Sequence, residues 1–163
     1  MAPRKIGGEV RAMVICSTIP RVVQYYQAIK SYLQEIKSPY QAIVAFSGEA
    51  DVAGTLMTES QLNGFPSDEI ADQIQEHPYR FLVCANKFQT GYDEPLLHTM
   101  YVDKILAGVQ AVQTLSRLNR SHPDKNSAFV LDFQNNFAHA IFSLQFCRTK
   151  TQSRRSCQSS FRC

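Results

Sequence analysis

Short apolar runs that alternate with helix-spaced patterns constrain the fold of this chain most. "AMVICS" at residues 12–17 and "QAIVAF" at residues 41–46 are apolar almost throughout, as strands buried on both faces are. Between them Pro20 opens a pattern in which apolar side chains recur at helix spacing. Strands of this kind joined by amphipathic helices predict an α/β fold with a parallel sheet covered on both faces. The apolar helix positions are Val22, Val23, Tyr26, Ile29 and Leu33.

The rest of the chain continues this alternation with one interruption. Residues 49–66 are polar with weak periodicity, and they predict a long loop or insertion with at most a short helix. Ser67 is expected to cap a helix over residues 67–77 that buries Ile70 and Ile74. Another helix is expected over residues 104–119. The remaining predicted strands are "RFLVCA", "TMYVD" and "AFVLDF".

Length and charge narrow the classes of function. A chain of 163 residues is about one domain long. It contains no apolar stretch of the roughly 20 residues that span a bilayer, and its start lacks the apolar centre of a secretion signal, so we expect a soluble, cytoplasmic protein. The formal net charge is +3, but residues 148–163 hold five Lys or Arg and no acid, which leaves twelve basic and fourteen acidic residues elsewhere. Any contact with nucleic acid must therefore come from local groups.

The cysteines and one acidic-basic pair receive no chemical role. The five cysteines form no CxxC and no cluster with zinc-ligand spacing. Cys16 and Cys84 fall in strand-like runs, where cysteine usually serves as a small buried hydrophobe. Glu35 and Lys37 match the ExK of restriction nucleases, but they fall at the end of the first predicted helix without an upstream Asp. We assign no metal site to this chain.

The predicted strand ends mark where a ligand site is expected. In open parallel sheets, ligands bind beyond the carboxyl ends of the strands. Several of these ends carry hydroxyl groups, glycines or acids, and a tight polar turn at residues 90–93 follows the strand "FLVCA". The alternative is that this turn binds nothing and only connects two strands. The residues at these ends are Ser17, Ser47, Gly48, Thr90, Gly91, Asp93 and Asp103.

The last predicted helix carries a polar row. Gln113, Arg117 and Arg120 stand at i, i+4 and i+7 and share one stripe. Guanidiniums one turn apart repel each other, so we expect an anion such as a phosphoryl group to face them. A solvated helix face is the open alternative. A neighbouring apolar stripe is formed by Ile105, Val109 and Val112. We expect this stripe to press on the sheet and to leave the polar row at the border of the covered surface.

Taken in order, these motifs resemble those of a known family. "CST", "FSG", "TGYD" and "QTLSRLNR" resemble motifs IV, IVa, V and VI of superfamily two helicases. "ANKFQTGYDEPLLHTMYVDK", "GVQAVQTLSRLNRSHPDK" and "FVLDF" resemble the restriction subunit of type I restriction-modification enzymes. The resemblance runs from about residue 12 to residue 133. It implies a second RecA-like helicase lobe over residues 12–135, preceded by an extension at residues 1–11.

The resemblance also implies roles for individual residues. Arg117 and Arg120 match the arginines that reach the γ-phosphate of ATP, and Gln113 matches the glutamine that helps to organise the attacking water. Those roles belong to an ATP site between two lobes. The other carried-over positions are Gly91 and Asp93 at the nucleotide cleft, and Thr90, Ser47 and Gly48 at the DNA backbone.

Important parts of an ATP-hydrolysing site are missing from the sequence. It contains no GxxxxGK[ST] and no DExx pair after an apolar strand. The resemblance therefore implies that ATP is shared with a first lobe, that this lobe holds Mg²⁺, and that the chain alone is inactive. The implied partners are duplex DNA, the first lobe and nuclease domain of the subunit, and the modification and specificity subunits.

Two alternatives and one boundary complete the sequence-based picture. The chain is alternatively part of another superfamily two helicase that acts on DNA or RNA, or an inert or purely binding α/β domain. Residues 146–163 are polar, basic and rich in cysteine, without helix or strand period. We expect residues 136–163 to be a divergent basic tail outside the fold, from a truncated or frame-shifted reading frame. The DNA target sequence belongs to the specificity subunit and is not predicted.

Overall fold

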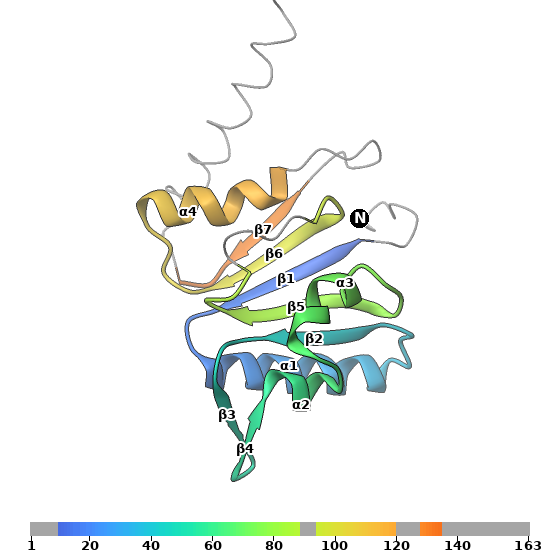
Figure 1. Cartoon of the computed structure of the whole chain (residues 1–163). Helices are drawn as coiled ribbons and strands as arrows, with labels where there is room; N and C mark the ends of the chain where they lie inside the picture. Colours follow the sequence, from blue (N-terminus) through green and yellow to red (C-terminus); the bar gives the residue numbers. More distant parts are fainter. Residues whose placement is uncertain (1–9, 89–93, 120–127, 135–163) are drawn as a thin grey trace, which may run out of the picture.

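A single five-stranded sheet forms the centre of the protein (Figure 1). The computed structural model describes residues 10–88, 94–119 and 128–134. All neighbouring strands are parallel, in the order β2-β5-β1-β6-β7. The sheet therefore has one carboxyl edge at which every strand ends. The strands are β1 (Arg11–Cys16), β2 (Gln41–Ala45), β5 (Tyr79–Ala85), β6 (Leu97–Asp103) and β7 (Phe129–Asp132).

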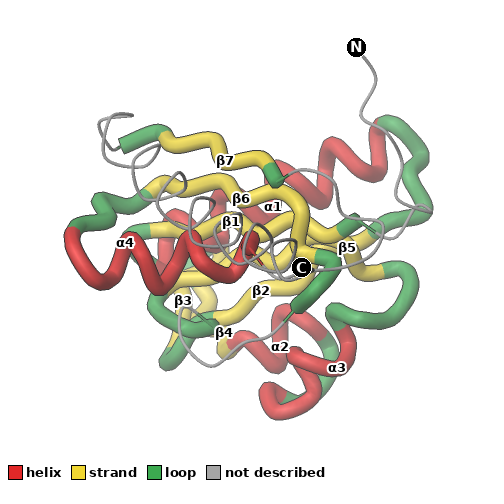
Figure 2. Tube along the Cα trace, turned by 90° about the horizontal axis from the view of Figure 1, so that it is seen from above, coloured by secondary structure: helices red, strands yellow, loops and turns green. Residues whose placement is uncertain are grey.

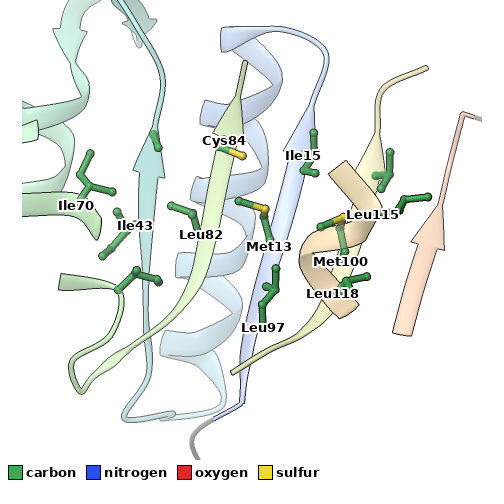
Figure 3. Packing of buried hydrophobic residues seen from close by; sticks show 13 residues of the cluster. Met13, Ile15, Ile43, Ile70, Leu82, Cys84, Leu97, Met100, Leu115 and Leu118 are labelled. Atoms are coloured by element: carbon green, nitrogen blue, oxygen red, sulfur yellow. The ribbon is translucent and has the colours of Figure 1, made fainter. Parts of the chain in front are cut away.

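Helices cover both faces of this sheet (Figures 1 and 2). On one face α1 (Ile19–Glu35) packs against a buried cluster that includes alternate residues of the central strands. On the other face α3 (Ile70–Gln73), α4 (Gly108–Leu115) and the 3₁₀ turn η2 (Ser116–Asn119) approach the second cluster, and Figure 3 shows its side chains. The predicted α/β fold is confirmed. Within the described ranges no helix is long and apolar enough to cross a bilayer.

The prediction of a loop or insertion with at most a short helix over residues 49–66 is confirmed only for the short helix, because a hairpin that was not predicted precedes it. This segment folds as an antiparallel hairpin, β3 (Glu49–Val52) and β4 (Thr55–Thr58), followed by α2 (Glu59–Asn63). Ala53 and Gly54 both have positive φ, as a two-residue type I′ turn requires. Two strands of four residues each are too short to give a clear alternating pattern. The hairpin extends away from the sheet at the lower left of Figure 1.

The helix after this insertion is shorter than predicted. The segment forms a 3₁₀ turn, η1 (Ser67–Glu69), and then α3. Ser67 does not cap either element, and its Oγ lies 2.7 Å from Ser60 Oγ. After α3 the backbone tightens, because the Gln75 and Glu76 amides donate to carbonyls three residues back. The predicted burial of Ile70 and Ile74 is confirmed.

The last predicted helix faces the sheet differently from the expectation. It begins at Gly108 rather than near residue 104, and it changes to 3₁₀ geometry at Ser116. The predicted sheet-facing stripe is wrong, because Ile105, Val109 and Val112 are 70%, 72% and 47% exposed. Because the helix is short and tightens at its end, it docks through its last turn. The residues that are buried instead are Thr114, Leu115 and Leu118.

Helix α2 lies along the outer edge of β2. The Asn63 side chain donates from Nδ2 to the Val44 carbonyl at 2.8 Å and accepts the Val44 amide on Oδ1 at 2.9 Å. A capping box between Thr58 and Gln61 fixes the start of α2, and Gly64 ends it in the left-handed region at φ 82°. Side chains of α2 thus satisfy backbone groups that an exposed edge strand would offer to another chain.

Candidate functional site at the carboxyl edge

Ser47 and Gly48 lie where expected, directly after the carboxyl end of β2. Both residues are exposed. Gly48 has φ +96°, and a Cβ built on it would meet no atom within 4 Å. Glycine is therefore favoured by backbone conformation and not by crowding. The turn leaves its backbone accessible from outside the protein.

Several predicted site residues lie outside the described ranges. The chain is described up to Phe88 and again from Glu94. The turn that contains Thr90, Gly91 and Asp93 falls between these points, and Arg120 follows the last described residue of η2. Their roles stay predictions from the sequence.

The segment that leaves β5 has an unusual backbone. Asn86 and Phe88 have φ values of 58° and 60°, and between them the Lys87 amide donates to the Ala85 carbonyl at 2.7 Å. Asparagine tolerates this left-handed region, but a bulky residue such as phenylalanine adopts it only at a cost. Such a conformation persists where surrounding contacts hold it.

Two side-chain contacts hold this turn. Lys104, which directly follows β6, donates from Nζ to Asn86 Oδ1 at 2.8 Å. Lys87 forms an ion pair with Glu59 at the start of α2. The Glu59 side chain is only 6% exposed, and its second carboxylate oxygen accepts the amide of Phe46 at 2.8 Å. Glu59 therefore joins the end of β2 to the turn after β5.

A second buried carboxylate lies at the end of β6. Asp103 Oδ1 accepts a hydrogen bond from Gln134 Nε2 at 2.8 Å, and Asp103 Oδ2 lies 3.7 Å from Arg21 Nε in the first turn of α1. Burial raises the pKa of the neighbouring Cys16 thiol to about 12, and the negative charge of Asp103 adds to that rise. The Cys16 thiol is thus held neutral and unreactive near pH 7.

Arg117 lies close enough to β5 for its charge to act on Cys84. Burial raises the pKa of the Cys84 thiol to about 12, while the positive charges of Arg117 and Lys104 oppose that rise. Cys84 is the last residue but one of β5 and pairs with Ala45 of β2. Arg117 is half-buried and Gln113 is exposed, so this part of the polar row lies at the border of the covered surface.

A buried structural ion pair lies at the amino ends of the strands, opposite the carboxyl edge. Arg11 donates from Nη1 to Glu94 Oε1 at 3.3 Å and from Nε to the Ile74 carbonyl at 2.7 Å. The same Glu94 oxygen accepts the Leu96 amide at 3.0 Å. Both charged side chains are buried. These contacts fix the chain where it enters β6.

The chemistry available at the carboxyl edge is binding and charge stabilisation. Cationic side chains, hydroxyl groups and an accessible glycine turn suit phosphate oxygens. Both described thiols are held protonated. In the part of the chain that the structure describes, no group of three or more His, Cys, Asp or Glu residues is placed to hold a metal ion.

Glu59, Lys87 and Asn86 were missed by the sequence analysis. Thr58 and Gln61 match the capping-box pattern, which marks the start of a helix and would have located α2. The ion pair of Glu59 with Lys87 joins residues 28 positions apart. Residues paired at that separation leave no signal in a single sequence.

Known proteins resemble this chain in sequence. The family Type I restriction enzyme subunit R domain 3 matches residues 54–135, half of the chain. A type I restriction enzyme endonuclease subunit of Staphylococcus saprophyticus, SsaAORF53P, is 27% identical over 141 residues, covering 67% of this chain and 15% of the relative. The MjaVIIP endonuclease subunit of Methanocaldococcus jannaschii is 39% identical over 57 residues, covering 35% of this chain and 5% of the relative. The chain thus spans less than a sixth of these relatives.

Several solved structures also resemble this chain. One of them is the ATP-dependent Type ISP restriction-modification enzyme LlaBIII bound to DNA, with a TM-score of 0.41 and 17% sequence identity. The similarity covers 78% of this chain and 8% of that chain.

Proposed function

Because this chain belongs to the Type I restriction enzyme subunit R domain 3 family, we propose that it is the second motor lobe of an ATP-dependent DNA translocase in a type I restriction endonuclease. In this proposal the lobe contacts the DNA backbone and contributes arginines to an ATP site that it shares with a first lobe. The partners are duplex DNA, the first lobe and nuclease domain of the subunit, and the modification and specificity subunits.

The observation that supports this proposal most is that two groups predicted from the sequence are linked to adjacent strands, β2 and β5. Ser47 follows β2 two residues after Ala45, the strand partner of Cys84. The charge of Arg117 acts on that same Cys84. The turn proposed to bind phosphate therefore follows the strand beside β5, and the charge of Arg117, which lies in η2, reaches β5 at Cys84.

Each group has a role that its chemistry fits. The Ser47 hydroxyl and the backbone amide of Gly48 are donors suited to DNA phosphate oxygens, which position a protein without reading sequence. The Arg117 guanidinium suits charge that develops on a transferred phosphoryl group, and Gln113 suits orientation of a water molecule. ATP would supply that phosphoryl group, and Mg²⁺ would be held by the first lobe. Thr90, Gly91, Asp93 and Arg120 complete the proposed site from the sequence.

DNA binding by the chain is tested with two matched glycine substitutions. Gly48 and Gly54 both have positive φ, and a Cβ added at either would meet no atom within 4 Å, but only Gly48 belongs to the proposed site. Gly48→Ala is expected to weaken binding of a fluorescent duplex on the order of tenfold, because the turn shifts away from the phosphate. Gly54→Ala, in the hairpin turn, is expected to bind like the wild type. Equal affinities of all three proteins would contradict the DNA contact.

The basic residues near the end of the chain need a separate control. Arg154→Gln with Arg155→Gln removes two of the charges there, and binding is compared at about 50 and 200 mM salt. The proposal predicts that the Gly48→Ala effect persists in this variant and at both salt concentrations. If all binding disappears with the two arginines, the domain does not bind DNA through its carboxyl edge. That result would support the alternative that the chain is an inert α/β domain.

The role of Arg117 is tested in a chimeric full-length subunit that carries residues 12–135 of this chain. Arg117→Ala is expected to lower DNA-dependent ATP hydrolysis by about 10³-fold, the scale on which a positioned arginine contributes to phosphoryl transfer. Lys37→Ala, an exposed residue after α1, serves as the control and should leave hydrolysis unchanged. Retained hydrolysis in the Arg117 variant would exclude the proposed role.

A further inference from the structure

The buried Glu59 carboxylate connects two turns of the edge that is proposed to bind DNA. One oxygen accepts the Phe46 amide, directly before Ser47, and the other pairs with Lys87 in the turn after β5, which is described over residues 86–88. We propose that Glu59 is a positioning residue for DNA binding, which holds the turn after β2 and the turn after β5 in fixed relation. This inference rests on the proposed function.

Glu59 is itself held rigidly. It is the first residue of α2, whose start is fixed by the Thr58–Gln61 capping box. Asn63, one helical turn later, is bonded twice to Val44 of β2. Residues at i and i+4 lie on the same side of a helix, so both side chains reach β2 from one face of α2. The carboxylate is therefore anchored to the sheet independently of Lys87.

The turn after β5 is the part that needs such an anchor. Asn86 and Phe88 both have left-handed backbone conformations on either side of Lys87. This arrangement costs free energy, most of all at Phe88, and relaxes when nothing holds it. The Lys87 ion pair with Glu59 restrains the turn from the side of β2, while Lys104 restrains Asn86 from the side of β6.

Electrostatics alone gives the opposite expectation for Glu59. The sequence between Lys37 and Arg80 contains seven acidic residues and no Lys or Arg, so Lys87 is brought to an acidic part of the chain. Removing one acid near a DNA-binding edge should strengthen binding, because the repulsion of phosphate decreases. A positioning role predicts weaker binding. The sign of the effect therefore separates the two explanations.

Glu59→Gln in the complete 163-residue chain is the decisive variant. Glutamine keeps the shape and an oxygen acceptor for Phe46, but it loses the charge that pairs with Lys87. We expect affinity for a duplex of about 20 base pairs, measured by fluorescence anisotropy, to fall about tenfold, the size of a typical coupling between interacting groups. Affinity equal to or higher than that of the wild type would overturn the inference.

Asn63→Ala is the matched control for general loosening of α2. It removes contacts between the same helix and the same strand but does not touch Lys87. This variant should lose stability in urea and bind DNA like the wild type. If it binds as weakly as Glu59→Gln, the effect comes from α2 docking in general, and the positioning role of Glu59 is overturned.

A charge-balanced double variant covers the case in which Glu59→Gln does not fold. Glu59→Gln with Lys87→Met has the same net charge as the wild type, so bulk electrostatics predicts unchanged affinity. The positioning role predicts about tenfold weaker binding, and wild-type affinity would overturn it. If the wild-type chain itself does not bind DNA, the proposed function and the inference fall together. If the wild type, Glu59→Gln and the double variant bind DNA equally well, only the inference fails.

Discussion

The helices α1 and α4 cover opposite faces of one sheet but are anchored in different ways. Helix α1 has 17 residues and buries Val22, Val23, Tyr26 and Leu33 along its length. Helix α4 has 8 residues and buries only Thr114 and Leu115 at its end. A long helix is held over several turns, whereas a short one that docks through its last turn has few buried contacts. We therefore expect α4 to open locally before the rest of the fold.

The strongest test of this comparison places a charge under α1. Val22 is completely buried, and Val22→Asp would leave a carboxylate without a partner in an apolar cluster. We expect it to lower the free energy of unfolding by about 4 kcal/mol or more. Gln24→Asp, an exposed position on the same helix, is the control. Urea unfolding followed by circular dichroism measures both, and a small effect at Val22 would break the assignment of the α1 core.

The next test concerns the end of the α4 segment. Leu118 in η2 is 2% exposed, and Leu118→Ala is expected to cost about 3 kcal/mol because it leaves a cavity over the sheet. Val112→Ala, on the outer side of α4, should change the free energy of unfolding by less than about 0.5 kcal/mol. Similar values for the two variants would mean that the last turn is not the anchor of α4.

One buried thiol lies under each helix and gives a pH-dependent probe of the comparison. Cys16 belongs to the α1 side and Cys84 to the α4 side. Burial raises both pKa values from 9.0 to about 12 in the folded protein. Above pH 9 the thiols ionise in the unfolded chain while they stay protonated in the fold. Stability that is fully present below pH 9 is therefore lost between pH 9 and pH 12.

We expect the urea midpoint to fall between about pH 8 and about pH 10, and to fall less in Cys16→Ala and Cys84→Ala variants. Alkylation mapped by mass spectrometry then compares the two sites at about pH 8. Local opening of α4 predicts faster labelling of Cys84 than of Cys16. Faster labelling of Cys16 would reverse the order of stability inferred for the two faces.

The smallest effect is expected on the outer side of α4. Val109 is 72% exposed, and Val109→Ser should change the free energy of unfolding by no more than about 0.5 kcal/mol. Thermal unfolding in a calorimeter measures the difference from the wild type. A loss of several kcal/mol would show that this side chain is covered in solution.

The same comparison explains how much of the fold followed from the sequence. Strands such as β1 and β5 are buried on both faces, so their apolar runs identified them directly. The period of α1 continues over enough turns to define its buried face. In α4 the helix starts late and changes geometry at Ser116, so the stripe extrapolated from Ile105 points outward. Local geometry of that kind is decided by tertiary contacts.

The candidate site also contains residues that the sequence predicted and residues that it did not. Ser47 and Gly48 were located correctly because strand ends and glycine turns are visible in a sequence. Arg117 is half-buried as expected, but the stripe from which this position was predicted faces outward. Glu59 was read as part of a loop, because its burial depends on Phe46 and Lys87, which are brought to it only by folding. Contacts between distant segments have to be observed in three dimensions.

The contact between Asn63 and Val44 also limits how copies of this protein can aggregate. A sheet with two free sides can join neighbours without end and grow into a fibril. Here the side chain amide occupies the position that an incoming strand would take beside β2. Among the described strands β7 is the outermost on the other side. Pairing of an incoming strand with β2 is therefore blocked at Val44.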